Sequence, residues 1–264
     1  MVILLELDRE KYIENLQDKD QIINIRRLLD KIEIVLNRHI IQSTDFLDPY
    51  EIKLSLSVLN QFDNIDYYVF GGLENSERKI IIIYPHYYIL GEEDIDLNYL
   101  MIYDYISEFS HRNFLGTVLS LGINRDKIGD ILIHEDYTQI IVKKEISDFI
   151  LISLKKVGRE NVKIKGIKRE DLAPVKLEYR HIHTTVSSLR LDNIISSALN
   201  LSRKESQKLI DLNFVKVNWE SINKYHREIE NEDMVSVRGY GRFIVELLGK
   251  TRKDRYRINI KLIK

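Results

Sequence analysis

Hydrophobic residues in the first third of the chain recur with the three- and four-residue spacing of a helix. The stripe consists of Ile22, Ile25, Leu28, Leu29, Ile32 and Val35. Asp8 or Asp20 is expected to cap a helix here, because a short acidic side chain can accept hydrogen bonds from free backbone N–H groups. A second helix is expected to begin at the Asp-Pro pair of residues 48–49 and to end at residues 63–64. The pattern predicts a helical N-terminal domain over residues 1–75.

Both helical and strand periods occur in the middle third, residues 76–180. Residues 79–84 are predicted to be a buried strand that Pro85 ends. Helices are predicted over residues 110–121, with Gly122 as a left-handed cap, and over residues 145–157, with Gly158 as the cap. A hairpin is expected over residues 128–142 and a strand over residues 161–167. The order strand–helix–strand–strand–helix–strand is that of a split βαβ (RRM-like) sandwich, which binds RNA in some proteins and not in others.

The last third, residues 181–264, is predicted to hold two short helices and a small twisted sheet. The helices are expected at residues 190–199 and from residue 201, where Ser202 and Glu205 form a capping box. Asn213 is expected to take up left-handed backbone where the second helix ends. Strands are expected at residues 214–218, 234–237, 243–245 and 256–262. The whole chain is therefore predicted to be an α+β protein in three parts.

Charge is distributed unevenly along these parts. The 264-residue chain has a formal net charge of −1. Residues 1–75 hold 8 basic and 14 acidic residues, a net charge of −6, and residues 76–180 have a net charge of −1. Residues 181–264 hold 16 basic and 10 acidic residues, a net charge of +6. A basic domain on a nearly neutral chain is typical of binding to a polyanion, although an accidental asymmetry of a solvated surface fits the same numbers.

Several kinds of chemistry are excluded or unsupported by the sequence. The chain has no cysteine, which excludes disulfides, thiolate zinc sites, iron–sulfur clusters and a cysteine nucleophile. No apolar run reaches the roughly 18 residues of a membrane span. Neither a Walker motif nor a Gly-x-Gly-x-x-Gly motif occurs, and His181 and His183 have no evident third zinc ligand. We therefore expect a cytoplasmic protein with no membrane contact, no cofactor and no bound metal.

The last third resembles the S4 RNA-binding domain. The matching stretches follow one another in the order of that domain: residues 188–192, 201–204, 209–210, 215–218 and 233–237. Asn213 departs from the pattern, since the family usually has glycine there, but both residues tolerate left-handed backbone.

Two further stretches are similar to the YlmH family of bacterial proteins. They are residues 112–131, which contain Arg-Asn-Phe-Leu-Gly and Leu-Gly-Ile-Asn-Arg, and residues 237–243, Val-Arg-Gly-Tyr-Gly-Arg-Phe. This resemblance covers nearly the whole chain and is weakest before Lys79. It implies a helical N-terminal part, a central sandwich and a C-terminal S4 domain.

The same resemblance implies a non-enzymatic RNA-binding factor that rescues stalled large ribosomal subunits. Such a factor would bind the large subunit carrying peptidyl-tRNA and support C-terminal tailing of the trapped chain with RqcH. The expected partners are therefore ribosomal RNA, tRNA and RqcH, and the expected state is a monomer.

Four basic residues near the starts of the two S4 helices are the first candidates for RNA contact: Arg190, Arg203, Lys204 and Lys208. Backbone N–H groups at helix starts also favour phosphate. Lys204 and Lys208 lie four residues apart and share a helix face. Solvated surface charge is the alternative explanation for all four.

A second group of candidates lies outside these helices. In residues 238–242, two glycines let the backbone approach a ligand closely, and Arg238, Tyr240 and Arg242 could clamp phosphates around a stacked base. A glycine bulge with a surface tyrosine is the alternative. Arg112 and Arg125 flank the predicted helix of residues 110–121 and could form another RNA surface, or could form ion pairs with Asp126 or Asp130.

Two other classes of function stay open at this point. One is an enzyme that modifies ribosomal RNA and uses the S4 domain as a substrate clamp. Its one local sign is the tripeptide of residues 190–192, which resembles the Arg-Leu-Asp of pseudouridine synthases, where the aspartate is the nucleophile. The other is a protein-interaction adaptor whose acidic N-terminal part binds a basic partner.

Overall fold

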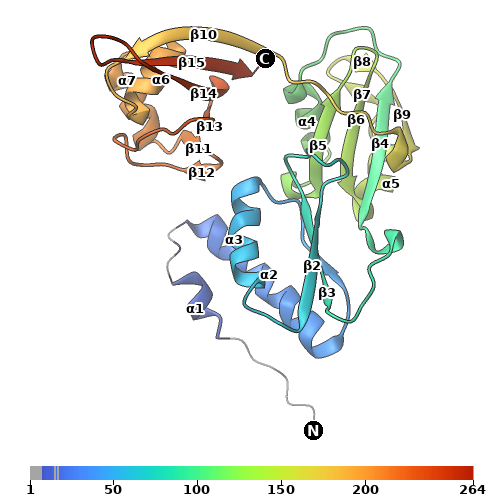
Figure 1. The fold of residues 1–264 in the computed structure, drawn as a ribbon. Coiled ribbons are helices and arrows are strands. Elements are labelled where there is room, and N and C mark those ends of the chain that lie inside the picture. Colours follow the sequence, from blue (N-terminus) through green and yellow to red (C-terminus); the bar gives the residue numbers. More distant parts are fainter. Residues whose placement is uncertain (1–7, 15, 17, 264) are drawn as a thin grey trace. The chain divides into compact units, whose positions relative to one another are not determined.

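The computed structural model describes residues 8–14, 16 and 18–263. The chain folds as two compact units, Met1–Val175 and Lys176–Lys264 (Figure 1). Both units combine helices with antiparallel sheets, so the predicted α+β class is confirmed. The division into three domains stays a proposal, since the first two predicted parts lie in the first unit.

The N-terminal region packs helices against one face of a three-stranded sheet. The helices are α1 (Glu10–Ile13), α2 (Lys19–Arg38) and α3 (Pro49–Leu59). The strands are β1 (Gln42–Ser43), β2 (Ile65–Phe70) and β3 (Ile80–Pro85), in the order β1-β3-β2. Five members of the predicted stripe on α2 are buried against this sheet: Ile25, Leu28, Leu29, Ile32 and Val35. The region is helical as predicted, but it also contains a three-stranded sheet that the sequence pattern did not predict there.

The ends of these helices differ in part from the prediction. Asp18 caps α2 by accepting the backbone N–H groups of Asp20 and Gln21, so the expectation of Asp8 or Asp20 was wrong. Asp18 is the residue whose backbone is extended directly before the first turn, which a cap requires. At α3 the predicted Asp48-Pro49 start is confirmed, with Glu51 completing a capping box. This helix ends at Leu59 with Asn60 as its cap, before the predicted residues 63–64.

Strand β3 has a different place from the one expected. It pairs along its whole length with β2, so it belongs to the N-terminal sheet and is not the first strand of the central sandwich. Ile81 and Ile83 pack towards the helices, whereas Ile80 and Ile82 pack against Leu97 and other residues of the central sheet. A strand buried on both faces reads as a continuous apolar run, whichever sheet it joins. The predicted boundary after residue 75 therefore falls between the two strands of one hairpin.

The central region has the predicted split βαβ order, beginning one strand later. It consists of β4 (Leu97–Tyr103), α4 (His111–Ser120), β5 (Ile128–Ile133), β6 (Tyr137–Lys143), α5 (Lys144–Ser153) and β9 (Lys163–Ile167), with the strand order β5-β6-β4-β9. Shorter elements are η1 (Glu92–Asp94), η2 (Arg125–Lys127), η3 (Arg169–Asp171), β7 (Lys156–Val157) and β8 (Glu160–Asn161). Gly122 has a φ of +85°, which confirms the left-handed position after α4. Gly158 does not cap α5, which ends at Ser153; it lies between β7 and β8 with a φ of +61°.

The C-terminal unit places two short helices on one side of a six-stranded sheet (Figure 1). The helices are α6 (Leu191–Leu199) and α7 (Arg203–Asp211), and the capping box of Ser202 with Glu205 is confirmed. The strands are β10 (Tyr179–Val186), β11 (Val215–Val217), β12 (Glu220–Ser221), β13 (Asp233–Val237), β14 (Gly241–Lys250) and β15 (Tyr256–Ile263), in the order β10-β15-β14-β13-β11-β12. Asn213 has a φ of +56°, as predicted. Edge strand β10 pairs with β15 over eight residues.

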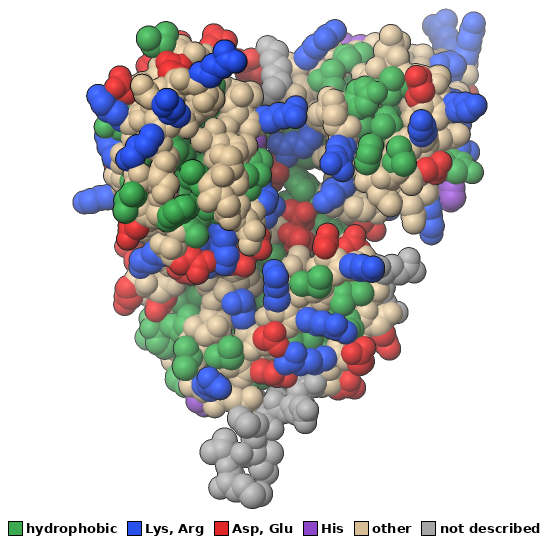
Figure 2. Space-filling view, turned by 180° about the vertical axis from the view of Figure 1, so that it is seen from behind, with side chains coloured by type: hydrophobic (Ala, Val, Ile, Leu, Met, Phe, Trp, Pro, Cys, Tyr) green, Lys and Arg blue, Asp and Glu red, His purple; other side chains and the backbone are tan. Residues whose placement is uncertain are grey.

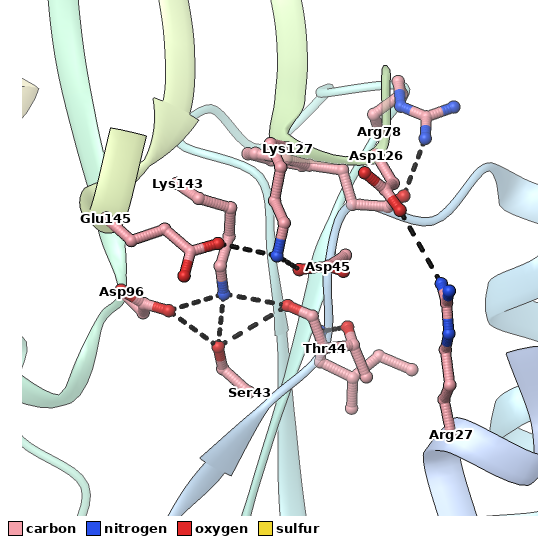
Figure 3. Close-up of polar contacts among 12 residues, drawn as sticks. Arg27, Ser43, Thr44, Asp45, Arg78, Asp96, Asp126, Lys127, Lys143 and Glu145 are labelled. Atoms are coloured by element: carbon pink, nitrogen blue, oxygen red, sulfur yellow. Dashed lines mark hydrogen bonds and ion pairs between the residues drawn. The ribbon is translucent and has the colours of Figure 1, made fainter. Parts of the chain in front are cut away.

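A buried lysine connects the N-terminal and central regions within the first unit. The Lys143 side chain is only 3% exposed. Its ammonium lies 2.5 Å from an Asp96 carboxylate oxygen and donates hydrogen bonds to the Ser43 hydroxyl and, at 2.9 Å, to the Thr44 carbonyl. Figure 3 shows this ammonium, at the end of β6, between Ser43 of β1, Thr44 directly after it, and Asp96 of the segment before β4. Because a buried charge is costly without partners, these contacts hold the two sheets in one arrangement.

Further polar contacts cross the same boundary (Figure 3). Lys127 bridges Asp45 at 2.7 Å and Glu145 at 2.6 Å. Asp130 on β5 accepts the backbone N–H groups of Glu77 at 2.7 Å and Arg78 at 2.9 Å, two residues that lie before β3. At Gly129 on β5, an added Cβ would lie 2.6 Å from the Phe46 ring, so glycine permits the close approach of the ring to the strand. Polar and apolar contacts together explain why residues up to 175 form one unit.

No helix in the described part of the chain combines the length and the apolar character needed to span a bilayer.

The Lys143 cluster predicts unequal effects for its two charged members. Asp96→Ala leaves the buried ammonium without its counter-charge and is expected to lower the free energy of unfolding by about 3 kcal/mol. Lys143→Met leaves only a carboxylate that is 39% exposed and can be solvated, so a loss of about 1 kcal/mol is expected. Lys163→Met, which breaks an exposed ion pair with Asp104, serves as the control and should change stability by less than about 0.5 kcal/mol. Urea unfolding measures all three, and a larger loss for Lys143→Met than for Asp96→Ala would contradict this view.

Candidate RNA interface

The two helix starts of the C-terminal unit meet around one buried carboxylate. Asp192 lies in the first turn of α6, and its side chain is fully buried. The carboxylate accepts hydrogen bonds from Arg190 at 3.1 Å, from Arg203 at 3.0 Å and from Gln207 at 2.7 Å. Since Arg203 and Gln207 belong to α7, this single side chain joins the two helices and fixes the position of two guanidinium groups.

The charge of Asp192 is strongly favoured in this position. Burial raises its pKa, but the hydrogen bonds from Arg190, Gln207 and Arg203 outweigh that effect and lower the pKa to about 2. The carboxylate is therefore ionised at neutral pH. The Arg190 and Arg203 side chains are 35% and 53% exposed, so each guanidinium contacts Asp192 and still reaches solvent.

A nearby loop closes over the start of α6. The backbone N–H groups of Leu191 and Asp192 donate to the carbonyls of Arg227 and Tyr225. The Arg190 guanidinium lies 5.7 Å from the centre of the Tyr225 ring. Arg190 is thereby held between a carboxylate and an aromatic ring, which favours one side-chain orientation.

Lys204 and Lys208 differ from the two arginines. Both side chains are exposed on α7, and neither has a hydrogen-bond or ion-pair partner among the residues that the structure describes. The structure therefore brings all four predicted S4 residues to α7 and the adjoining start of α6, as two oriented guanidinium groups and two free ammonium groups. Sequence reasoning missed Asp192 and Gln207 as organisers, because a first-turn aspartate is common at any helix start.

The glycine-rich motif forms the tight turn between β13 and β14. Gly239 and Gly241 have φ values of +88° and +105°, which side chains with a Cβ rarely adopt. The Arg238 guanidinium lies 5.1 Å from the centre of the Phe214 ring, and Tyr240 is 50% exposed at the turn. Arg242 lies on β14 opposite Ser236.

This turn does not join the cluster around Asp192. Phe214 follows the C-terminal end of α7, whereas Arg203 begins that helix. Nine residues of helix separate the two places by about 13 Å. The motif is thus a hairpin turn with an exposed tyrosine, and it could contact an extended ligand only at a second point.

Arg112 and Arg125 lie at opposite ends of α4. Arg112 is exposed in the first turn of α4, and Arg125 lies beyond the other end of that helix. The Arg125 guanidinium donates to the carbonyls of Ile128 and Gly129, and burial lowers its pKa to about 10. Arg125 donates no hydrogen bond to either predicted partner, Asp126 or Asp130. Asp126 forms an ion pair with Arg27, and Asp130 accepts the backbone N–H groups of Glu77 and Arg78.

The sheet face of the central region, opposite α4 and α5, is covered along part of its length. Gln139 on this face is fully buried and exchanges hydrogen bonds with the backbone of Asp171 and Ala173. Ile141 lies in an apolar cluster with Leu172 and with Ile80 of β3. Ligands therefore have no access to this part of the face.

At the opposite end of the same face, two tyrosines face each other across the central strands. Tyr103 on β4 is opposite Tyr137 on β6, and both are partly exposed. The Lys165 ammonium lies 5.4 Å from the centre of the Tyr103 ring, and the His134 ring stacks on Tyr137 at 4.5 Å. Sequence reasoning did not select these residues, because neighbours across a sheet cannot be recognised until the strands are paired. The available signals were the tyrosines at 99 and 103 on β4 and the lysines at 163 and 165 on β9.

The histidines on β10 do not build a metal site. His181 and His183 stack with ring centres 6.4 Å apart, and His181 shares a hydrogen bond with Asn259. Within the described residues, no group of three or more His, Cys, Asp or Glu side chains could hold a metal ion.

Fold and site together define an RNA-binding protein with a C-terminal S4 domain. Residues 189–235 match the family model of the S4 domain. Residues 92–171 match a model described as a candidate RNA-binding domain in YlmH, and residues 20–88 match the model of the YlmH N-terminal part.

The chain belongs to the YlmH family. It is 34% identical over 247 residues to the ribosome-associated protein quality control protein P2 of Bacillus subtilis, across 92% of this chain and 95% of that protein. A solved structure named cell division protein ylmH, from Streptococcus pneumoniae, has the same fold over 60% of this chain and 97% of its own, with a TM-score of 0.52 and 22% identity. The predicted family is therefore confirmed.

The low pKa of Asp192 predicts a stability change in acid. The pKa of Asp192 is about 2 in the folded chain, whereas the ordinary value for an aspartate is 3.8. The ionised carboxylate therefore stabilises the fold above about pH 4, and this contribution is lost as the pH falls through about 2. Between these limits the wild type should lose about 2 kcal/mol more unfolding free energy than Asp192→Asn, which cannot titrate. Urea unfolding of the two proteins at several pH values measures the difference. Parallel pH profiles would show that Asp192 has an ordinary pKa.

Proposed function

We propose that this protein is a non-enzymatic factor that binds the large ribosomal subunit carrying peptidyl-tRNA during the rescue of stalled translation. The observation that carries the proposal is the cationic surface of α6 and α7, in which Asp192 orients Arg190 and Arg203 beside the free ammonium groups of Lys204 and Lys208. Family membership adds support, since the Bacillus subtilis relative is named a ribosome-associated quality control protein. In this role the protein works at cytoplasmic ribosomes as a monomer, together with RqcH, and supports C-terminal tailing of the trapped chain.

The chemistry of the α6–α7 surface suits folded RNA. Guanidinium and ammonium groups bind phosphates, and pre-orientation of the two arginines lowers the entropy lost on binding. Contacts of this type recognise the shape and backbone of an RNA helix and carry little sequence information. Ribosomal RNA and the tRNA held on the large subunit present such helices. Tyr240 and Arg238 at the β13–β14 turn would contact the same RNA at a second point.

A further RNA contact is proposed at Tyr103 and Tyr137 on the central sheet. Aromatic side chains on the two central strands of a split βαβ sheet stack unpaired bases in RNA-binding domains of this architecture. Lys165 beside Tyr103 supplies a positive charge, while Lys163 is paired with Asp104. Only the end of the face with these tyrosines is accessible, so the contact would take one or two unpaired bases.

The surroundings of Asp192 count against the enzymatic alternative. A catalytic aspartate must reach its substrate, but this carboxylate has no exposed surface and accepts hydrogen bonds from three side chains. A role in orienting Arg190 and Arg203 accounts for all of these contacts. RNA binding without chemistry is therefore the proposed role of the site.

Removal of the two free lysines tests the α6–α7 surface. In sucrose gradients with purified large subunits, Lys204→Ala/Lys208→Ala should bind more weakly than the wild type, and the slope of log affinity against log salt should fall by about 2. These exposed side chains have no partner in the described part of the protein, so the fold should be unaffected. Lys53→Ala/Lys155→Ala, with the same change of charge in the first unit, is the control. Equal co-sedimentation of both double variants would refute the assignment of this surface.

The tyrosine pair is tested with unpaired RNA. Tyr103→Leu/Tyr137→Leu should weaken the binding of a short oligouridine by about tenfold or more, because each lost base stack costs roughly 1–3 kcal/mol. Fluorescence anisotropy of a labelled oligouridine measures the affinity. Tyr68→Leu, at a tyrosine that is 41% exposed on β2, should leave it unchanged. An unchanged affinity in the double variant would remove the central sheet from the proposed RNA interface.

A further inference from the structure

One end of the N-terminal region exposes an unusual number of apolar side chains. Ile89 is 91% exposed, Tyr87 62%, Ile40 52% and Tyr88 37%. Figure 2 shows hydrophobic side chains with a histidine beside them at the lower left, at this end of the N-terminal region. Isolated exposed apolar residues are normal, but a contiguous group of them marks a contact surface. We call this group the apolar end patch.

Direct contacts bring three segments of the chain together at the patch. The Tyr87 hydroxyl lies 3.0 Å from the Nδ1 atom of His39, the residue that precedes Ile40 in the sequence. The Tyr88 ring packs 6.4 Å from Tyr84 and its hydroxyl donates to Asp94 at 3.1 Å. His86 donates its backbone N–H to the Asn64 carbonyl, which joins the turn between α3 and β2 to the same surface. Three segments that are distant in the sequence therefore meet here.

The charge around the patch is almost entirely negative. Residues 37–41, 60–68 and 84–96 form the patch and its surroundings, and they contain six acidic residues against the single basic residue Arg38. Asp96 is neutralised by Lys143, and Asp94 accepts from Tyr88. Four exposed carboxylates have no hydrogen-bond or ion-pair partner among the residues described, namely Asp63, Asp66, Glu92 and Glu93. A phosphate backbone would be repelled by this surface.

The backbone adds to the negative potential. Helices α2 and α3 both end here, α2 with His39 as its cap and α3 with Asn60. The carbonyl ends of helices carry partial negative charge and attract cations. Beyond the end of α3, Phe62, Asp63 and Asp66 line an open hollow on this surface. Apolar surface, free carboxylates and helix ends thus occupy one place.

We infer that the apolar end patch is a docking site for a protein segment that combines lysine or arginine with apolar side chains. Apolar residues of the segment would cover Tyr87 and Ile89, and its cations would pair with the surrounding carboxylates. The charge selects a basic protein segment and disfavours RNA, whereas the cationic surface of α6 and α7 has the opposite preference. The N-terminal region then contributes a protein contact in addition to the RNA contacts of the other regions.

A peptide titration of the purified full chain tests the patch without ribosomes, so its result is independent of the proposed ribosomal role. The probe is a short labelled peptide of alternating lysine and leucine, and fluorescence anisotropy measures its affinity for the protein. Tyr87→Ser/Ile89→Ser should weaken its binding by about tenfold or more, as expected for loss of the central apolar contacts of an interface. Asp63→Asn/Asp66→Asn/Glu92→Gln/Glu93→Gln should weaken it similarly and reduce its dependence on salt.

Controls distinguish peptide binding at the patch from non-specific hydrophobic binding and from RNA binding. Ile106→Ser changes an isoleucine that is 97% exposed outside the patch and should leave peptide binding unchanged. A peptide of alternating glutamine and leucine should bind at least about tenfold more weakly. Oligouridine affinity should be the same for the wild type and Tyr87→Ser/Ile89→Ser. The inference is overturned if the lysine–leucine peptide fails to bind, if it binds all variants equally, or if the patch variant loses oligouridine binding.

Discussion

The first unit depends on the need to neutralise one buried charge. The ammonium of Lys143 has almost no access to water, so its positive charge is tolerated only while Asp96, Ser43 and Thr44 surround it. These partners come from β1 and from the segment before β4, while Lys143 itself ends β6. One side chain thereby specifies how the N-terminal sheet lies against the central sheet. The apolar contacts of Ile80 and Ile82 fill the same boundary but would tolerate small shifts that the charge does not.

The C-terminal unit uses the same principle with the opposite sign and a different consequence. Asp192 is a buried carboxylate, and its partners are two arginines that extend to the surface. The positive charge of Lys143 is neutralised by Asp96 within the protein, so this cluster stabilises the fold and leaves no net charge for a ligand. At Asp192 two guanidinium groups compensate one carboxylate, which leaves net positive charge at the helix starts. The family model that covers residues 189–235 describes the domain in which this excess charge lies.

The small net charge of the chain conceals surfaces of opposite character. Four exposed carboxylates, Asp63, Asp66, Glu92 and Glu93, lie around the apolar end patch. Arg190, Arg203, Lys204 and Lys208 lie at the start of α6 and on α7. Such surfaces attract different partners, since phosphate avoids the first and favours the second. A protein that meets both RNA and basic protein segments gains specificity from this separation.

Local chemistry was sufficient to predict much of the fold. The capping boxes at Asp48 and Ser202, the left-handed positions at Gly122 and Asn213, and the basic face of α7 depend on residues within a few positions of each other, so the sequence alone determined them. Tertiary structure alone decided that β3 joins the N-terminal sheet, that Arg125 donates its hydrogen bonds to backbone carbonyls and that Tyr103 faces Tyr137. These outcomes depend on which strands pair and which groups lose contact with water. An apolar run or a charged side chain looks the same in the sequence whichever partner it finds.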